Sequence, residues 1–463
     1  MGDKSGLRAF YWFFSMSDFM GGDVIYALSS GAGPSGVAVV RASGAGVVEL
    51  AEAMCGRVPQ PRMATVCSLY HPIDKTLLDQ ALVLFFKGPK SFTGEDVVEF
   101  HVHGGRAVVE SVLEALGSFP GCRLAERGEF SRRGFENGKL DLLEVEGLAD
   151  LIAADTKAQH SQALAQMQGR FSSLYENWRS QLIYAIALVE SALDFSDEGD
   201  VPEEVAGEAV APVRDLYKAI EAHLDDGHRG EIVRDGFRVA IAGRPNAGKS
   251  RLLNALAQRD VAIVSDEAGT TRDVIEVRLD IEGYPIVLSD TAGLRETASK
   301  VEQEGIRRSV ETSRQAGLIL WVVDGAAPEL SVPDELTGFG VPVLSIWNKG
   351  DVVSPSKNQS EGLDIEISAE TGEGLSELIN LIGAQASTQL GLGEGVMITR
   401  VRHRALLHRT VEALGAFLKG DMVETELRAE DLRRAAFALG GLTGKVDVED
   451  VLDHLFLEFC VGK

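Results

Sequence analysis

The sequence predicts a multidomain protein of mixed α+β and α/β class, in which a helical domain is interrupted by an inserted α/β domain with a mostly parallel sheet. Three changes of texture along the 463 residues support this prediction. Short β-rich runs with Gly and Pro turns precede Lys139, and amphipathic helical stretches continue to about Gly230. Strands then alternate with helices from Phe237 to about Ala384, and helical character returns from Thr399 to Lys463.

These changes of texture set the expected segments and their elements. We expect a disordered or artefactual extension at 1–22, an N-terminal domain at 23–137, helical parts at 138–230 and 389–463, and the inserted domain at 231–388. In the N-terminal domain, strands are predicted at Val24–Leu28, Val37–Arg41, Ala81–Phe86 and Val97–Val102. Helical stretches are predicted at Leu140–Ala154 and Tyr175–Leu193.

Composition excludes several classes of protein. Lys and Arg number 45 against 70 Asp and Glu, a net charge of −25, which argues against a surface that grips nucleic acid as a whole. The 4 cysteines form no C-x-x-C pair, so neither a disulfide framework nor a zinc ribbon is predicted. No run approaches the roughly 18 apolar residues that span a bilayer. We therefore expect a cytoplasmic protein without a membrane segment.

The most basic stretch of this acidic chain is Arg400-Val-Arg402-His-Arg404, followed by His408-Arg409. Such a run is typical of a helix face that is solvated or contacts another domain. A contact with tRNA is the alternative.

The strongest chemical signal is the sequence from Gly243 to Ser250, which has the form G-x-x-x-x-G-K-S. It follows the buried-strand run Phe237–Ala242 and opens a helix at Arg251–Ala257, the context that a phosphate loop requires. Backbone N–H groups converge on phosphates at such a helix N-terminus. Lys249 would reach the β- and γ-phosphates, and the Ser250 hydroxyl would ligate Mg²⁺.

Further motifs follow the phosphate loop in the order that a guanine-nucleotide site requires. Gly269-Thr-Thr271-Arg-Asp can supply a Mg²⁺-ligating threonine, and the D-x-x-G motif Asp290–Gly293 follows the strand run Ile286–Leu288. Asn348-Lys-Gly-Asp351 follows the strand Val343–Trp347, and its carboxylate would accept hydrogen bonds from guanine that adenine cannot donate. Ser368-Ala-Glu370 would close over the base. The ordered set predicts binding of GTP.

One position departs from the Ras-like pattern. Leu294 follows the D-x-x-G glycine where Ras-like proteins carry the glutamine that orients water, so charge neutralisation and water positioning must come from other groups. Asn246 in the phosphate loop is a candidate ligand for a monovalent cation. The alternative is that Asn246 only stabilises the loop.

In the N-terminal domain, strand periodicity places Glu99, His101 and His103 on the face opposite Val98, Phe100 and Val102. This residue set favours the wall of a polar pocket, and a metal site is the alternative.

Taken together, the chain resembles the bacterial tRNA-modification GTPase MnmE (TrmE) family, within the TrmE-Era-EngA-YihA-Septin-like GTPase superfamily, from about Asp23 to Lys463. The resemblance rests on the motifs above and on motifs outside the GTPase core. These are Ser91–Glu99, His103-Gly-Gly105, Gly128-Glu-Phe130, Asn137–Asp141 and the terminal Cys460-Val-Gly-Lys463.

The resemblance implies a potassium-activated, homodimeric GTPase whose N-terminal domain has a folate-binding-like α+β fold. It implies a catalytic, water-orienting Glu302, which without the family reads as a solvated carboxylate at a helix start. It implies Mg²⁺ at Ser250 and Thr271, and K⁺ at Asn246, Ser265, Glu267 and Thr270. The expected nucleotide contacts are Asn246, Ala247, Gly248, Lys249, Ser250, Arg251, Ser265, Asp266, Glu267, Ala268, Gly269, Thr270, Thr271, Asp290, Thr291, Ala292, Gly293, Asn348, Lys349, Asp351, Ser368, Ala369 and Glu370.

For the N-terminal domain, the resemblance implies that Arg41, Glu99, Lys139 and Lys463 contact a tetrahydrofolate (5,10-methylene or 5-formyl). The carboxylate of Glu99 suits the donor pair at the pterin edge, and cations suit the carboxylates and the formyl oxygen of the cofactor. Cys460 would be a nucleophile or a shielded thiol near the one-carbon unit, and no local base marks it as activated.

The function that this implies is installation of a carboxymethylaminomethyl or aminomethyl group at C5 of the wobble uridine in certain tRNAs. The resemblance implies a flavoprotein partner, MnmG (GidA), carrying FAD and NAD(P)H, with glycine or ammonium as the nitrogen source and tRNA bound mainly through that partner. Two alternatives remain: a regulatory GTPase of the ribosome-assembly type, and a stand-alone folate-dependent aminomethyltransferase.

Overall fold

The computed structural model describes residues 23–31, 33–194, 207–259, 261–263, 276–290, 314–338, 340–357, 359–391, 397–420, 424–446, 451–452, 455–456, 459 and 461–462. The chain divides into two compact units, the first formed by residues 1–145 with 448–463 and the second by residues 146–447. None of the helices in the described ranges is long and apolar enough to cross a membrane.

The first unit is built on a sheet with the strand order β3-β4-β5-β2-β1-β6, in which only the β1–β6 pair is parallel. The predicted strands are present, most of them longer at their ends than predicted. The elements are β1 (Val24–Leu28), β2 (Ser35–Ser43), α1 (Val47–Cys55), β3 (Thr65–Tyr70), β4 (Leu77–Phe86), β5 (Val97–Gly104), α2 (Arg106–Gly117), β6 (Cys122–Leu124) and α3 (Glu129–Glu136).

The two faces of this sheet differ in character, because side chains alternate along each strand. Val98, Phe100 and Val102 of β5 are buried in a core that also contains residues of α1 and α2. Glu99 and His101 lie on the opposite face, where Phe130 of α3 packs in a separate apolar cluster. The predicted alternation along β5 is therefore confirmed, and aromatic residues partly cover the polar face of the sheet.

The C-terminal segment adds to the first unit in a way that the sequence did not predict. Val461 forms an antiparallel bridge with Arg127, and the Ser29 hydroxyl donates to the Gly462 carbonyl at 2.8 Å. Gly462 has φ = 106°, and a Cβ there would collide with the carbonyl oxygen of Leu28. The expectation of helix through to Lys463 is thus wrong at Val461, which forms a bridge, and at Gly462, where the backbone approaches Leu28 in a conformation that favours glycine.

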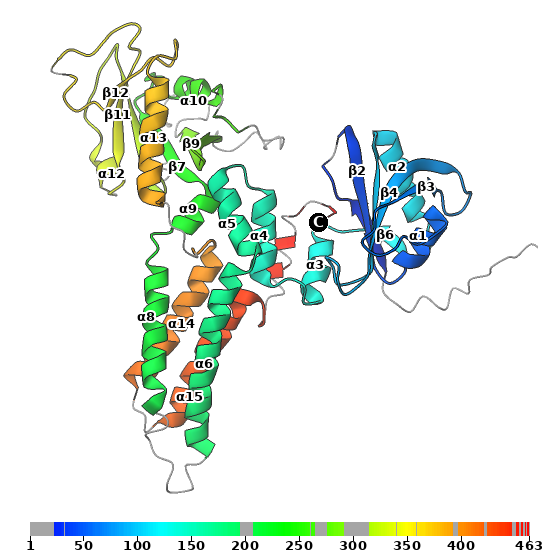
Figure 1. Ribbon diagram of the computed structural model, residues 1–463. Helices are drawn as coiled ribbons and strands as arrows, with labels where there is room; N and C mark the ends of the chain where they lie inside the picture. Colours follow the sequence, from blue (N-terminus) through cyan, green and yellow to red (C-terminus); the bar gives the residue numbers. More distant parts are fainter. Residues whose placement is uncertain are drawn as a thin grey trace, which may run out of the picture. The chain divides into compact units, whose positions relative to one another are not determined.

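The second unit contains long helices and a second sheet. In Figure 1, α6, α8, α14 and α15 lie side by side, and the predicted stretches Leu140–Ala154 and Tyr175–Leu193 correspond to α4 and α6. The helices outside the sheet region are α4 (Leu142–Ile152), α5 (Lys157–Met167), α6 (Arg170–Asp194), α8 (Val210–Leu224), α9 (Arg229–Asp235), α14 (Val401–Lys419) and α15 (Thr425–Thr443).

The second sheet has the order β12-β11-β10-β7-β9-β8, parallel except for the β8–β9 pair, so the predicted mostly parallel sheet is confirmed. Its apolar strands are buried on both faces, as parallel strands usually are. The elements are β7 (Phe237–Gly243), α10 (Lys249–Ala257), β8 (Glu276–Ile281), β9 (Tyr284–Asp290), β10 (Leu318–Asp324), α12 (Asp334–Thr337), β11 (Val343–Asn348), β12 (Ile365–Glu366) and α13 (Leu375–Leu390).

The chain enters and leaves the sheet region at neighbouring points. The backbone N–H of Ile398 donates to the Asp226 carboxylate at 3.3 Å, and a Cβ on Gly230 would collide with the carbonyl of Ile398. The segments 226–230 and 397–398 therefore run side by side. This is the geometry of a domain inserted into a helical fold.

A buried carboxylate joins the two helical parts. Glu146 of α4 is 1% exposed and accepts from Arg402 Nε at 2.6 Å and His403 Nε2 at 2.8 Å, both on α14. Burial alone would raise the pKa of Glu146, but electrostatic attraction and hydrogen bonds from His403 and Arg402 outweigh it and hold that pKa well below its usual range, while burial lowers the pKa of His403 itself. The expected basic run is thus a domain-contacting helix face, at least at these two residues.

The cluster around Glu146 continues toward the sheet. Asp150, one turn further along α4, accepts from Arg400 Nη2 at 2.8 Å and from Arg234 Nε at 3.1 Å. Arg404 pairs with Asp226 at 2.8 Å. Arg234 lies on α9, which leads directly into β7, so Asp150 links the entry to the sheet with α14.

We expect Glu146→Gln to lower the free energy of unfolding of the second unit by about 3–5 kcal/mol, because it removes one partner of a buried ion cluster. Thermal and denaturant unfolding followed by circular dichroism measure this change. The matched control is Glu190→Gln, which removes an exposed pair with Arg433 at 2.9 Å and should cost about 0–1 kcal/mol. Equal losses in the two variants would contradict a structural role for the cluster.

Candidate functional site

The phosphate loop joins the end of β7 to the start of α10. Gly243 has φ = 152° and Gly248 has φ = 92°, and a Cβ at either position would collide with a neighbour, the Val322 carbonyl or the Asn348 amide. The glycines of the motif are therefore required by backbone conformation and by close packing. As a result, the N-terminus of α10 lies directly against Asn348, the last residue of β11.

The described members of the set expected to contact phosphate and Mg²⁺ lie together. Lys249 is 9% exposed, and its Nζ donates to the carbonyls of Gly243 at 2.9 Å and Arg244 at 3.0 Å. The Ser250 hydroxyl donates to Asp290 Oδ2 at 2.6 Å. A hydroxyl and a carboxylate oxygen this close are hard oxygen donors that suit Mg²⁺.

The base-recognition motifs form the other end of the site. Asn348 is 2% exposed; its Nδ2 donates to the Ala247 carbonyl at 2.8 Å and its Oδ1 accepts from Ala369 N at 3.0 Å. The Ser368 hydroxyl donates to Asp351 Oδ1 at 2.6 Å. Asn348 therefore ties the phosphate loop to the Ser368–Glu370 loop, and Asp351 lies between the two loops.

A cleft of about 360 Å³ lies between these motifs. Its lining includes Asn246, Gly248, Asn348, Asp351 and Ala369. The size suits a small ligand. The cleft thus combines a phosphate loop at one end with a carboxylate that can accept from guanine at the other.

Asp324 is a contributor to this site that sequence reasoning missed. It ends β10, and its Oδ2 pairs with Lys349 Nζ at 2.7 Å, while Lys349 itself has φ = 68°. Burial would raise the pKa of Asp324, but the hydrogen bond and charge of Lys349 outweigh it and lower that pKa. The available signal was an aspartate directly after the buried run Leu318–Val323, which places it at the carboxyl edge of the sheet.

Asn246, the candidate cation ligand, lies within the described ranges. It has φ = 63°, its side chain is exposed, and no hydrogen bond of its amide to another described residue is observed. The expected site residues that lie outside the described ranges are Ser265, Asp266, Glu267, Ala268, Gly269, Thr270, Thr271, Thr291, Ala292, Gly293, Glu302, Cys460 and Lys463, as does Leu294.

The first unit holds a separate polar site on the sheet face opposite α1 and α2. Arg41 of β2 lies directly across from Glu99 of β5, and their side chains pair at 2.8 Å. The guanidinium of Arg41 lies 5.5 Å from the centre of the Phe92 ring and 5.7 Å from that of Phe130. Both charged groups are about four-fifths buried, with 21% and 15% of their side chains exposed, so this is a preorganised pair inside an aromatic frame.

The remaining residues of this face divide between the polar site and its surroundings. His101 Nε2 lies 3.5 Å from the other Glu99 oxygen, whereas His103 is exposed and pairs with Asp79 at 2.8 Å. Lys139 is exposed, with its stem next to Gly94. Among the described residues, no group of three His, Cys, Asp or Glu is arranged to hold a metal ion. The structure therefore brings together Arg41, Glu99 and His101, but not His103.

Asp351→Ala should remove the preference for GTP over ITP, which lacks the exocyclic amino group of guanine. A hydrogen bond to a charged acceptor contributes about 1.5–3 kcal/mol, so GTP affinity should fall at least tenfold while ITP affinity falls less. Calorimetric titration of both nucleotides measures the two effects. Asp334→Ala on α12, an exposed aspartate of the same sheet region, is the control. An undiminished GTP preference in Asp351→Ala would show that other groups read the base.

Comparison with known proteins agrees with this geometry. The family model for the "MnmE helical domain" matches residues 142–460, and that for the "GTP-binding protein TrmE N-terminus" matches residues 24–139. The chain is similar to proteins named tRNA modification GTPase MnmE from Rhodopseudomonas palustris (49% identity, 95% of this chain and 98% of that one) and Parvibaculum lavamentivorans (50%, 95% and 100%). It is also similar to that from Azorhizobium caulinodans (50%, 95% and 99%). The chain therefore belongs to the MnmE (TrmE) family of tRNA modification GTPases.

Proposed function

We propose that this GTPase is activated by potassium and that, with a flavoprotein partner of the MnmG (GidA) type, it installs a carboxymethylaminomethyl or aminomethyl group at C5 of the wobble uridine. The carbon would come from a tetrahydrofolate held by this chain. The observation that carries the proposal is the coexistence, on one chain, of a guanine-nucleotide cleft and a separate Arg41–Glu99 site framed by aromatic rings.

The polar site of the first unit supports a folate role through its chemistry. A carboxylate that is mostly buried and held in place by a guanidinium presents an acceptor oxygen to the paired N–H donors of a pterin edge. Phe92 and Phe130 supply flat apolar surface next to it. Glu99 would orient the ring, and Arg41 would hold the carboxylate in place.

Asn246 supports the potassium role by its position. Its amide is exposed in the nucleotide cleft, and the described contacts give it no part in stabilising the loop. A monovalent cation held there would offset negative charge that develops between the β- and γ-phosphates. Leu294 stands where Ras-like proteins carry the glutamine that orients water, and a leucine cannot do this. Glu302, the residue that the resemblance indicates, would orient the attacking water instead.

Analysis of tRNA nucleosides from a strain lacking the gene tests the whole proposal. The C5-substituted wobble uridine should disappear and return when the wild-type chain is supplied. Return with Lys249→Ala as well would favour a stand-alone aminomethyltransferase over a GTP-dependent enzyme. Unchanged wobble uridine together with a ribosome-assembly defect would favour the regulatory alternative.

GTP hydrolysis should require K⁺ and fall steeply when Na⁺ replaces it, because groups that neutralise charge in this position contribute about 10³–10⁵ in rate. Steady-state turnover in matched KCl and NaCl measures this. Asn246→Ala should lose most of the K⁺ stimulation, whereas Asn254→Ala, an exposed asparagine on α10, should keep it. Equal rates in the two salts would refute potassium activation.

Glu99→Ala should abolish binding of 5-formyltetrahydrofolate and leave GTP turnover close to that of the wild type. Losing the buried partner of a donor pair costs about 2–5 kcal/mol, enough to erase a micromolar site. Calorimetry measures folate binding, and circular dichroism checks the fold. Glu52→Ala, an exposed carboxylate on α1, is the control. Full folate binding by a folded Glu99→Ala chain would place the folate elsewhere.

A further inference from the structure

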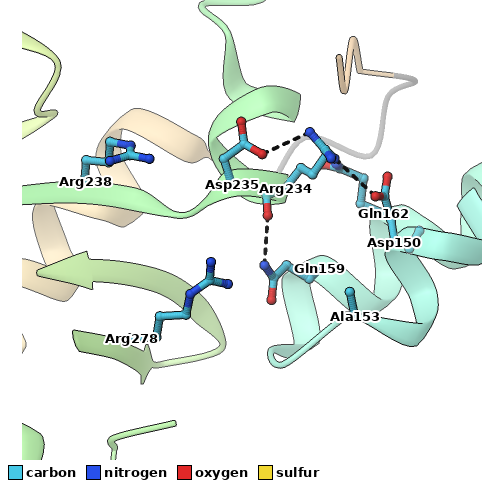
Figure 2. A pocket seen from close by; sticks show the side chains of 9 residues that line it. Asp150, Ala153, Gln159, Gln162, Arg234, Asp235, Arg238 and Arg278 are labelled. Carbon is cyan, nitrogen blue, oxygen red and sulfur yellow. Dashed lines mark hydrogen bonds and ion pairs between the residues drawn. The ribbon is translucent and has the colours of Figure 1, made fainter. Parts of the chain in front are cut away.

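A second cleft, of about 430 Å³, lies in the second unit where α4, α5 and α9 meet the sheet (Figure 2). It shares no lining residue with the nucleotide cleft. Arg234, Arg238 and Arg278 line it, together with Asp150 and Asp235. Cations outnumber carboxylates in this lining, although the whole chain carries 45 basic and 70 acidic residues.

Two of the arginines form a matched pair on the sheet. Arg238 of β7 and Arg278 of β8 are both in register with Val287 of the intervening strand β9, so they flank one buried valine on the same face. Figure 2 shows both arginines on the strand side of the cleft and Gln159 on the helix side. This register places the two arginines, both exposed, on either side of Val287 on one face of the sheet.

These two guanidinium groups have little charge compensation from the protein. Arg238 reaches Glu276 at 3.4 Å in a pair whose side chains are 46% and 40% exposed, which is a weak interaction. For Arg278, no ion pair to a described residue is observed. The two aspartates of the lining, Asp150 and Asp235, each form an ion pair with Arg234 at 3.1 Å. The Arg238–Arg278 pair is therefore open to an anion.

A buried acceptor on the helical side points to a second feature of the ligand. Gln162 of α5 is 9% exposed and lines the cleft, and its Nε2 donates to the Gly230 carbonyl at 3.0 Å. Its Oε1 is buried and has no hydrogen-bond partner among the described residues. A buried acceptor without a donor is costly and rare, so a ligand with an O–H or N–H group would satisfy it.

We propose that this cleft binds a small phosphate ester that also carries hydroxyl groups. Its phosphate would be held by Arg238 and Arg278, whose planar donors match phosphate oxygens. A hydroxyl would donate to Gln162 Oε1. A volume of about 430 Å³ lies in the range of small-molecule sites.

Calorimetric titration of the full chain with ribose 5-phosphate, in saturating GDP and Mg²⁺, tests the proposal. We expect saturable binding by the wild type, at least tenfold weaker binding by the Arg238→Gln/Arg278→Gln double variant, and no binding of ribose, which lacks the phosphate. Arg409→Gln, an exposed arginine on α14 outside the cleft, should bind like the wild type.

Thermal unfolding provides a second readout and a check of folding. Ribose 5-phosphate should raise the unfolding temperature of the wild type and of Arg409→Gln, but not that of the double variant. Equal binding by the double variant, or no saturable binding at millimolar concentration, would overturn the proposal. Displacement of the sugar phosphate by tRNA would also overturn it, because the arginines would then belong to an RNA-binding surface.

Discussion

The burial of the Glu146 carboxylate constrains how the two helical parts of the second unit pack together. An ionised carboxylate removed from water is stable only when cations and hydrogen bonds replace the lost hydration. Here Arg402 and His403 supply them, from a helix more than 250 positions along the chain. Because Glu146 lies on α4 and its partners lie on α14, these contacts hold the two helices together. The two helical parts therefore form one fold, although the whole GTPase domain intervenes between them.

The same cluster defines how the GTPase domain is attached. Asp150 bonds both Arg400 of α14 and Arg234 of α9, immediately before the first strand of the parallel sheet. The segment 397–398, through which the chain returns to the helical fold, lies beside residues 226–230. Both connections of the insertion thus pass through a small region rich in buried ion pairs. The sheet also contacts α5 directly, since the backbone N–H of Ala158 donates to the Gly283 carbonyl at 3.1 Å. A movement of the GTPase domain can therefore act on the helical fold through these connections and through α5.

Sequence reasoning succeeded wherever the signal was local. The alternation along β5 and the strand before the phosphate loop depend on neighbours within a few residues, and the phosphate loop is recognised by the spacing of its own residues; the fold class followed from these signals. Sequence reasoning left open what depends on distant partners. The basic run at Arg400–Arg404 reads equally as a solvated face, because nothing nearby shows that Glu146 and Asp226 meet it. Asp324 and the bridge at Val461 were missed for the same reason: their partners, Lys349 and Arg127, are set by tertiary structure.

The most direct test of this account removes the inserted domain. In a chain whose residues 231–396 are replaced by a short Gly-Ser linker, the contacts of Glu146 with Arg402 and His403 remain available, and the ends to be joined are adjacent. We predict that the helical fold unfolds cooperatively in denaturant and that Glu146→Gln still destabilises it by about 3–5 kcal/mol. Loss of cooperative unfolding in the shortened chain, or insensitivity to Glu146→Gln, would contradict the claim that the buried cluster helps to hold the two helical parts together without the inserted domain.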